Sequence, residues 1–245
     1  RMAYGVADMS TLKVDPESGK QKPDYRWNDE ELTEQVYLNH LIGTQSIGVQ
    51  PCNENSNARF GVVDVDPKNY TNFDKKFFID IIQNYNLPLI PILSKSGGLH
   101  LYLFMSEFVP AVLIRSFLSN LLPLFKLKPD CEIFPKQTQL TKDNETGQLN
   151  KGNFINLPYF KKSERVAINV DGKAFTFDQF IEVLESNTAT PEKLKTITES
   201  IEQKDLEGVD KEFDDGPPCL AHLSKIMKNP GFDGKDRFMY NYHVF

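Results

Sequence analysis

Two carboxylates stand close together where an apolar segment of the chain ends, in Val62-Val63-Asp64-Val65-Asp66. Alternate residues of a strand point to the same face with Cα atoms about 6.5 Å apart, so Asp64 and Asp66 can both reach cations at the strand's end. Such carboxylates suit hard divalent ions such as Mg²⁺ or Mn²⁺, and two ions about 3.5 to 4 Å apart promote phosphoryl transfer. The alternative is a solvated Asp-Pro turn after a strand.

A second segment of interest is a turn of small residues, Ser94-Lys95-Ser96-Gly97-Gly98-Leu99-His100. Small residues let backbone N–H groups come close to phosphate oxygens, and Lys95, the hydroxyl groups and His100 add further donors. The segment could therefore bind a triphosphate. Taken alone, a Ser-Gly-Gly turn is equally compatible with an ordinary hairpin.

A third segment places a charge inside an apolar strand, in Asp130-Cys131-Glu132-Ile133-Phe134-Pro135-Lys136-Gln137. A buried charge costs free energy unless it is paired or bound to a metal, which makes Glu132 a candidate ligand. The alternative is a glutamate on an edge strand that faces water.

Hydrophobic periodicity predicts the elements that position these three segments. Apolar runs predict strands at 60–65, 89–93, 100–104 and 131–134, and apolar stripes at helical spacing predict helices at 77–85 and 113–121. The order strand, helix, strand, strand, helix, strand is that of the split βαβ unit of ferredoxin-like and RNA-recognition-like domains. We therefore expect an α+β fold.

The flanking sequence contains two candidate capping boxes. Asn28 with Glu31 predicts a helix that runs to about Leu41, and Thr176 with Gln179 predicts another. Further strands are expected at 154–157 and 166–170. From Thr190 the chain is acidic and helical in pattern, so we expect a domain boundary near Asn187, with one domain at 1–187 and an acidic linker and helical module at 188–245.

Composition narrows the class of protein. The chain has 245 residues, of which 40% are hydrophobic and 25% charged, as in an ordinary globular protein. It has neither an apolar run of 18 residues nor a signal-peptide pattern, which predicts no membrane span and a cytoplasmic location. Its three cysteines lie far apart, so we expect a reducing compartment and no zinc site.

Charge is unevenly distributed along the chain. The net charge is −6, but residues 190–215 carry nine acidic residues against four lysines, whereas residues 91–165 carry ten basic against six acidic residues. A basic middle region is compatible with a polyanionic substrate such as nucleic acid. The alternative is that both regions are solvated faces.

The three segments together resemble the motifs of the archaeo-eukaryotic primase superfamily, the primase-polymerases. VVDVDP, SKSGGLH and CEIFPKQ match its three motifs in order, and GNFINLPYF is similar to a segment of primases from phages, plasmids and TOTE conflict systems. The upstream sequence LNHLIGTQSIGVQPCNENSNARF also resembles the lead-in of those proteins. The resemblance covers roughly residues 35 to 180.

The resemblance implies a role for individual residues. Asp64, Asp66 and Glu132 would hold Mg²⁺ or Mn²⁺, Asp130 could replace Glu132, and Cys131 occupies the position where some relatives place the acid. His100 would contact the phosphates of the incoming nucleotide, above a turn made by Ser96, Gly97, Gly98 and Lys95. Lys136, Gln137 and Asn156 are candidates for the triphosphate and the sugar.

The resemblance also implies an activity for the domain at 1–187. This is template-directed nucleotidyl transfer by two metal ions, as primase and DNA polymerase, on single-stranded DNA with dNTPs or NTPs, in bacterial or phage replication.

Tyr102, Phe134 and Tyr159 could stack on template bases if they are exposed, and are otherwise core residues. The helical module would help to start chains, and the apolar end of the chain suggests a fragment of a larger replication protein, with a helicase as a possible partner.

Two other classes of function remain open. A DxD motif after an apolar strand also marks nucleotide-sugar transferases, although these do not predict the Glu132 and His100 segments. A non-catalytic module that binds single strands is the other alternative, although its central strands would normally display aromatic residues rather than carboxylates and a histidine.

Overall fold

The computed structural model of the chain describes residues 4–14, 21–28, 30–70, 72–142, 147, 149–161 and 163–201, with the backbone alone at 8–13 and 21–25. The chain divides into two compact units, Arg1–Leu194 and Lys195–Phe245. The structure describes no residue beyond position 201, so most of the helical module predicted at 188–245 lies outside the described residues. The domain boundary near Asn187 stays a prediction.

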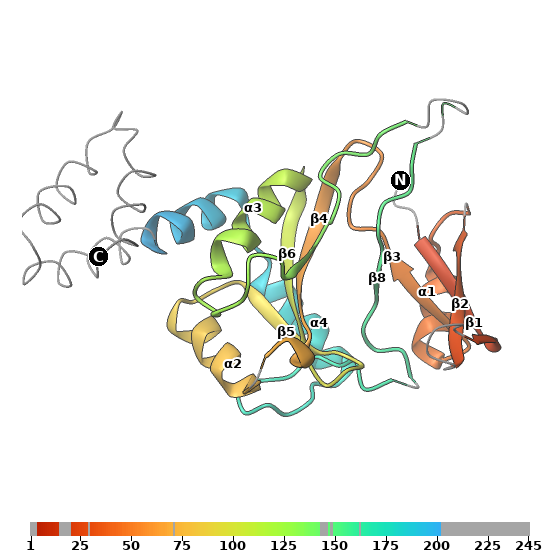
Figure 1. Ribbon diagram of the computed structural model, residues 1–245, viewed down its shortest axis with the longest axis horizontal. Helices are drawn as coiled ribbons and strands as arrows, with labels where there is room; N and C mark the ends of the chain where they lie inside the picture. Colours follow the sequence, from red (N-terminus) through yellow and green to blue (C-terminus); the bar gives the residue numbers. More distant parts are fainter. Residues whose placement is uncertain are drawn as a thin grey trace, which may run out of the picture. The chain divides into compact units, whose positions relative to one another are not determined.

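One four-stranded antiparallel sheet carries the three segments with candidate chemistry (Figure 1). Its elements follow one another as β4 (Asn57–Val65), the 3-10 helix η1 (Pro67–Asn69), α2 (Lys75–Asn84), β5 (Leu89–Leu93), β6 (Leu99–Pro110), α3 (Ala111–Leu121) and β7 (Glu132–Phe134). The strand order is β5-β6-β4-β7, and every neighbouring pair is antiparallel. The central strand β4 therefore lies between the two strands that carry the other two segments.

The two faces of this sheet pack against different elements, because successive residues of β4 point to opposite faces. Gly61 faces α3, and a Cβ atom at this position would overlap an isoleucine side chain of that helix. Val62 faces the other way together with its neighbour Tyr102 on β6. Both belong to a core cluster that includes Phe180 of α4 (Phe177–Asn187). Since helices cover both faces, the polar residues gather at the strand ends.

A second antiparallel sheet contains the N-terminal hairpin. It is built from β1 (Tyr4–Val14), β2 (Gln21–Asn28), β3 (Gln45–Val49) and β8 (Ile155–Asn156), in the order β2-β1-β3-β8, and α1 (Glu34–Ile42) connects β2 to β3. Phe60 of β4 packs against the core clusters of both sheets. The two sheets therefore share packed side chains in the first unit.

A buried histidine joins α1 to this second sheet. His40 Nδ1 accepts a hydrogen bond from Ile47 N at 3.2 Å, so Nε2 carries the proton and donates to the carbonyl oxygen of Pro158 at 2.8 Å. Burial lowers the pKa of His40, more than the hydrogen bond to Pro158 raises it. The neutral ring thus holds together three segments that are distant in the sequence.

The predicted start of the first helix and one predicted strand are wrong, whereas the first helix itself is present and ends at Ile42, close to the expected Leu41. Asn28 does not begin a helix: it is the last residue of β2, where its Oδ1 accepts a hydrogen bond from Glu30 N at 2.9 Å, and α1 begins only at Glu34. Residues 166–170 do not form a strand either, because they make only isolated bridges, from Ala167 to Ile92 and from Ile168 to Ala174. The chain at Asn28 is therefore the end of a strand, whereas residues 166–170 are irregular.

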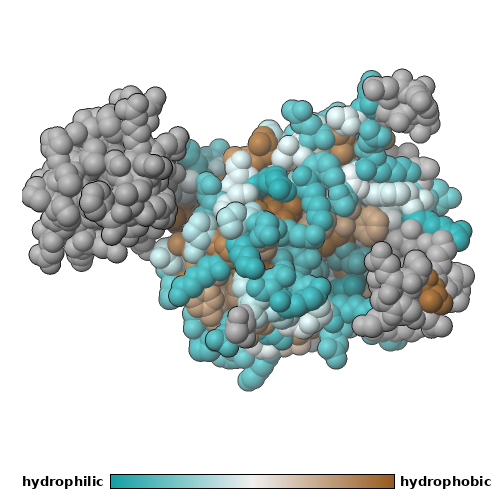
Figure 2. All heavy atoms as spheres, in the orientation of Figure 1, coloured by the Kyte–Doolittle hydropathy of each residue, from teal (hydrophilic) through white to brown (hydrophobic). Residues whose placement is uncertain are grey.

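The expected α+β class is confirmed by the mixture of helices with two antiparallel sheets. The capping box of α4 is also confirmed, since Thr176 and Gln179 exchange side-chain to backbone hydrogen bonds. Within the described residues, no helix has the length and apolarity that crossing a membrane requires. The face in Figure 2 is mostly hydrophilic, and its apolar side chains form small separate areas.

Candidate active site

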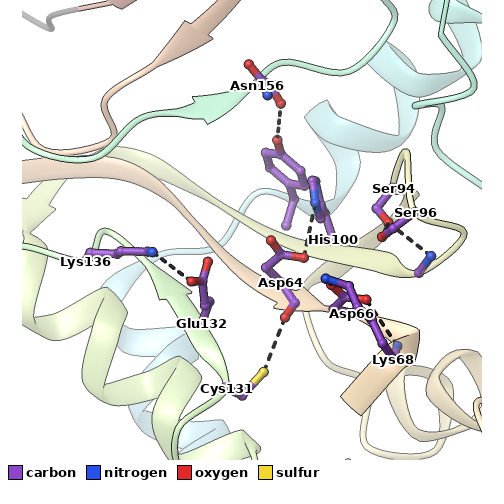
Figure 3. Close-up of polar contacts among 12 residues, drawn as sticks. Asp64, Asp66, Lys68, Ser94, Ser96, His100, Cys131, Glu132, Lys136 and Asn156 are labelled. Atoms are coloured by element: carbon purple, nitrogen blue, oxygen red, sulfur yellow. Dashed lines mark hydrogen bonds and ion pairs between the residues drawn. The ribbon is translucent and has the colours of Figure 1, made fainter. Parts of the chain in front are cut away.

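A row of three polar residues crosses the first sheet at the end of β4. Asp64 is the direct partner of His100 on β6 and of Glu132 on β7. Residues that lie opposite one another in an antiparallel sheet project to the same face, so these three side chains share one side of the sheet. The structure thus brings together one residue from each of the three predicted segments (Figure 3).

Asp64 and His100 are in contact. The imidazole Nε2 lies 3.3 Å from Asp64 Oδ1, and the two side chains are 11% and 30% exposed for His100 and Asp64 respectively. The buried ring of Tyr102 lies next to the imidazole, with the ring centroids 6.3 Å apart. The histidine is therefore held between an apolar residue of the core and the aspartate at the edge of the site.

Asp66 is fixed by the start of the short helix that follows it. Its carboxylate caps η1 by accepting a hydrogen bond from Lys68 N at 3.1 Å, and Lys68 Nζ lies 2.6 Å from its other oxygen. Partial burial would raise the pKa of Asp66, but these contacts with Lys68 outweigh it and lower that pKa. Asp66 is thus an ionised carboxylate just beyond the end of β4.

The small-residue turn lies directly against the end of β4. Ser94 Oγ accepts a hydrogen bond from Gly98 N at 3.0 Å and shares another with Ser96 Oγ at 2.9 Å. A Cβ atom at Gly98 would overlap the carbonyl oxygen of Val65, so only glycine permits this close approach. Gly97 has φ = 84°, which also favours glycine. The turn thereby presents its hydroxyl groups beside the aspartates.

A cleft of about 450 Å³ opens between this turn and β8, with Asp64 and Asp66 in its wall. Its lining also contains three basic side chains and several neutral ones, namely Lys95, His100 and Arg165 with Ser94, Ser96, Phe134, Phe154, Ile155 and Asn156. The lining of this cleft therefore combines two carboxylates, basic side chains and hydroxyl groups with neutral residues.

Arg165 lines the larger cleft, although the sequence motifs did not identify it. The bridge from Ala167 to Ile92, with a hydrogen bond from Leu93 N to Val166 O at 2.9 Å, runs its segment along β5 toward the turn at Ser94. The guanidinium is in none of the ion pairs found among the described residues. The only sequence signal for it was its place at the end of the basic region 91–165.

A second cleft, of about 320 Å³, lies on the other side of Asp64 and Asp66. Asp130 and Glu132 add two more carboxylates to its wall, and Lys68 and Lys128 add two ammonium groups. Both candidates for a third metal ligand therefore border the same cleft as the DxD pair. Glu132 is the one that lies in the sheet, directly opposite Asp64.

Cys131 sits among these carboxylates as a neutral thiol. Burial, together with the negative charges of Asp64, Asp130 and Glu132, raises its pKa to about 11. Its Sγ donates a hydrogen bond to the backbone oxygen of Asp64 at 3.4 Å. A thiol bound in this way is a weak candidate for a metal ligand, because thiols ligate metals as thiolates.

The carboxylates do not converge on one point. Asp66 turns to Lys68, Asp64 to His100, and Glu132 to Lys136 Nζ at 2.9 Å (Figure 3). Within the described part of the chain, no three His, Cys, Asp or Glu side chains are grouped closely enough to hold one ion. The donor set is nevertheless three partly exposed carboxylates, which fits Mg²⁺ or Mn²⁺ in the chemistry of its oxygen ligands.

Several predicted residues lie outside the larger cleft. Lys136 pairs with Glu132 and covers the ring of Phe134, with Nζ 5.2 Å from its centroid. Gln137 instead braces a loop, since its Oε1 accepts a hydrogen bond from Asn153 N at 2.9 Å. Gly97 and Gly98 shape the turn without lining the cleft. Asn156 does line it.

The aromatic residues expected to be available for stacking are mostly in the core. Tyr102 and Phe134 are 1% and 6% exposed, so template bases cannot stack on them in this structure. Tyr159 is partly exposed, and its hydroxyl donates to the carbonyl oxygen of Phe175 at 3.2 Å while its ring packs on α4. All three stabilise the fold.

A comparison with known families gives the context of these clefts. A family model described as the archaeo-eukaryotic primase domain of TOTE conflict systems matches residues 15–200, which contain every residue of both clefts. No curated protein matches the chain. Members of the primase superfamily are generally nucleotidyltransferases and typically use divalent metals. The chain belongs to the archaeo-eukaryotic primase family, as the type found in TOTE conflict systems.

Proposed function

We propose that this protein is a template-directed nucleotidyltransferase that synthesises or extends primers on single-stranded DNA. The observation that carries the proposal is the position of Asp64 and Asp66, which form a wall shared by two clefts of different character. One cleft offers cations and hydroxyl groups, which suit a nucleoside triphosphate. The other offers further carboxylates and two lysines, which suit metal ions and the end of a primer.

The triphosphate would bind between the turn and Arg165. Ser94 and Ser96 offer hydroxyl groups, while Lys95 and Arg165 of the same lining offer positive charge. A guanidinium that has no acidic partner among the described residues is well suited to phosphate oxygens, which it can bind through two parallel hydrogen bonds. Lys136 and Gln137, predicted for the same role, would need to move to reach this cleft.

His100 would donate a hydrogen bond to a phosphate oxygen. Its Nε2 faces the site and lies 3.3 Å from Asp64 Oδ1, which favours the tautomer with the proton on that nitrogen. Once Asp64 binds a metal ion, this N–H would be released from Asp64 and could donate to the phosphate. The histidine is thus a binding residue whose position depends on the neighbouring carboxylate.

Asp64, Asp66 and Glu132 would hold the divalent ions, with Asp130 as the substitute for Glu132. The β4–β7 register supports Glu132, because it places this residue opposite Asp64 on the same face. When bound, the ions would lower the pKa of the attacking hydroxyl and neutralise charge as pyrophosphate leaves. Lys68 and Lys136, which now neutralise two of these carboxylates, would then be released toward phosphate groups.

Asn156 would contact the sugar. Its side-chain oxygen is buried and has no hydrogen-bond partner among the described residues. Buried polar atoms nearly always have a partner, so one without a partner at the wall of a cleft suits a residue that is completed by its ligand. Whether the cleft prefers dNTPs or NTPs would depend on contacts at this position.

The two alternative functions are less compatible with the site. A nucleotide-sugar transferase would account for the DxD motif but not for His100 and Glu132 in the same row. A single-strand-binding module would need an open sheet face, whereas the face with Tyr102 and Phe104 is covered by Phe180 of α4, 6.3 Å from the Phe104 ring. The order of elements from β4 to β7 supports an RNA-recognition-like unit, but one used here as the scaffold of a catalytic site.

The test is to incubate the protein with labelled dNTP, NTP or UDP-sugar, with Mg²⁺ or Mn²⁺, and with single-stranded or primed DNA. Template-dependent incorporation of nucleotides is the expected result. Transfer of the sugar would instead support the first alternative. Binding of DNA without either reaction, in the presence of both metals, would support the second.

A further inference from the structure

One row of paired residues in the second sheet has two glycines in its middle and ends at the larger cleft. Gly5 of β1 pairs with Trp27 of β2 on one side and with Gly48 of β3 on the other, and Gly48 pairs with Asn156 of β8. These four positions form one row on the same face of the sheet. The two glycines in the middle therefore leave the backbone bare between a tryptophan and an asparagine that lines the cleft.

The ring of Phe154 fills this strip. A Cβ atom added at Gly48 would overlap the ring, and one added at Gly5 would lie 3.1 Å from Phe154 Cε1. Trp27 meets the same ring edge to face, at a centroid distance of 5.3 Å and an angle of 87°. Lys151 Nζ lies 5.7 Å from the Trp27 ring centroid. The ring of Phe154 therefore packs on the backbone of Gly5 and Gly48 and against the ring of Trp27.

Phe154 also lines the larger cleft. Phe154, Ile155 and Asn156 of its lining follow one another on one segment and carry no charge, whereas Lys95 belongs to the turn and His100 to β6. A nucleotide has the same asymmetry, since its triphosphate is highly charged and its base is flat and neutral. A nucleotide whose triphosphate binds at the turn would thus place its base toward the neutral segment that contains Phe154.

We propose that Phe154 is the stacking platform for the base of the bound nucleotide, and that Gly5, Gly48 and Trp27 position it. This inference rests on the proposed function, because it takes the larger cleft as the nucleotide site. Stacking on an aromatic ring tolerates every base, since each base has a π-face. A platform of this kind suits a template-directed enzyme, in which the template and not the protein must choose among four bases.

Trp27 allows a direct test, because it is the single tryptophan of the chain. Nucleotides with each of the four bases, added with Mg²⁺ and without DNA, are expected to change its fluorescence in a saturable way. Tripolyphosphate should bind in competition with them but leave the fluorescence unchanged, because it has no base. Equal fluorescence changes with tripolyphosphate, or a change that appears only when template DNA is added, would overturn the assignment to the bound nucleotide's base.

Phe154→Ala is expected to weaken the binding of all four nucleotides about 5- to 150-fold, the range for loss of one stacked base, and to leave tripolyphosphate binding unchanged. The matched control is Phe108→Ala, since Phe108 is 46% exposed and lines neither cleft. Wild-type affinity of Phe154→Ala for nucleotides would overturn the proposal.

The glycines provide a second, graded test. Gly48→Ala should weaken nucleotide binding nearly as much as Phe154→Ala because it displaces the ring, and Gly5→Ala should have a smaller effect because its Cβ would only touch the ring edge. In a Phe154→Ala background, Gly48→Ala should add little, since no ring remains to displace. Full additivity would contradict positioning. If the platform fails these tests while Asp64→Asn still abolishes incorporation, the proposed function stands without it.

Discussion

His100 and Asp64 face each other across the β4–β6 ladder, and the 3.3 Å between Nε2 and Oδ1 connects the two halves of the site. His100 belongs to the group of residues suited to phosphates, and Asp64 to the group suited to metals. Because these two side chains are in contact, a ligand that binds to one of them changes the environment of the other. Substitutions at these two positions should therefore not have independent effects.

The first prediction concerns the aspartates at the end of β4. Asp64→Asn and Asp66→Asn keep the shape of the side chain but remove a ligand charge, so nucleotide incorporation should fall at least about a thousandfold, as expected for several kcal/mol of lost transition-state stabilisation. Steady-state incorporation of labelled nucleotide measures the loss, and circular dichroism checks the fold. Asp80→Asn is the control, because Asp80 pairs with Lys76 on the surface of α2 and lines neither cleft.

The same assay distinguishes the two candidates for the third ligand. Glu132→Gln should be as inactive as the aspartate variants, whereas Asp130→Asn should keep most of the activity because Asp130 precedes β7. The reverse result would assign the role to Asp130. Normal synthesis by the double variant of Asp64 and Asp66 would remove the metal site from this position altogether.

The second prediction concerns His100 as a nucleotide contact. His100→Ala should raise the apparent KM for nucleotide and lower incorporation, yet leave the affinity for template DNA nearly unchanged. A purely structural histidine would behave differently: its loss would lower the melting temperature and weaken all properties together. Nucleotide titrations, DNA binding by fluorescence anisotropy and thermal unfolding should be compared on the same variant.

The third prediction concerns the turn beside β4. Gly98→Ala forces a Cβ atom onto the carbonyl oxygen of Val65, so it should move the turn, destabilise the protein and raise the KM for nucleotide. Gly97→Ala leaves open space around the new Cβ atom, but the alanine must keep φ = 84°. This conformation should lower the free energy of unfolding by only about 1 to 2 kcal/mol and should change the activity little. Urea unfolding and nucleotide kinetics check both. An equal effect of the two substitutions would contradict the close packing of the turn.

The fourth prediction concerns His40 and pH. Because burial lowers the pKa of His40 in the folded protein, the unfolded chain binds more protons at this residue below about pH 6.5. Its contribution to stability is therefore complete above about pH 6.5 and is lost as the pH falls toward the lower folded value. Urea unfolding at several pH values between 5 and 8 should show a steeper loss of stability for the wild type than for His40→Gln. Since the other histidines are common to both proteins, identical slopes would contradict this role for His40.

The elements that the sequence predicted well are those with local causes. The capping box of Thr176 and Gln179 acts within one helical turn, and the apolar run at 89–93 coincides with β5. Asn28 and Glu31 have the same spacing, but β-pairing with Tyr4 on β1 places Asn28 at the end of a strand. That pairing is not local, so periodicity around Asn28 could not reveal it.

The grouping of the candidate site residues was predictable where chemistry is concentrated in short motifs. The DxD pair, His100 and Glu132 were found because each stands out in its own segment, and the register of three strands then aligns them. Arg165 and Phe154 were missed because neither is unusual in its local sequence. Arg165 reaches the cleft through a bridge to β5, and Phe154 acquires its place only from glycines more than 100 residues earlier in the chain.

The last prediction concerns the C-terminal part of the chain, where the predicted basic module has four basic residues against two acidic ones between Gly216 and Phe245. A basic module on an acidic tether suits the capture of template or initiating nucleotide, because phosphate is attracted by the module and repelled by the tether. A protein that ends after residue 201 should therefore still extend a preformed primer but fail to start chains on bare template. Gel assays with primed and unprimed DNA measure both activities.

The position of the cut decides whether this experiment is informative. A cut at the predicted boundary, Asn187, would remove Ala189, whose N–H donates to Phe104 O at 2.8 Å and whose oxygen accepts from Ser106 N at 2.9 Å. It would also remove Leu194, which is buried. The shorter protein, 1–187, should therefore be destabilised and lose both activities, whereas 1–201 keeps these contacts. Chain initiation by a soluble 1–201 protein would contradict the role of the module, and aggregation of 1–201 with loss of primer extension would assign the missing part a packing role instead.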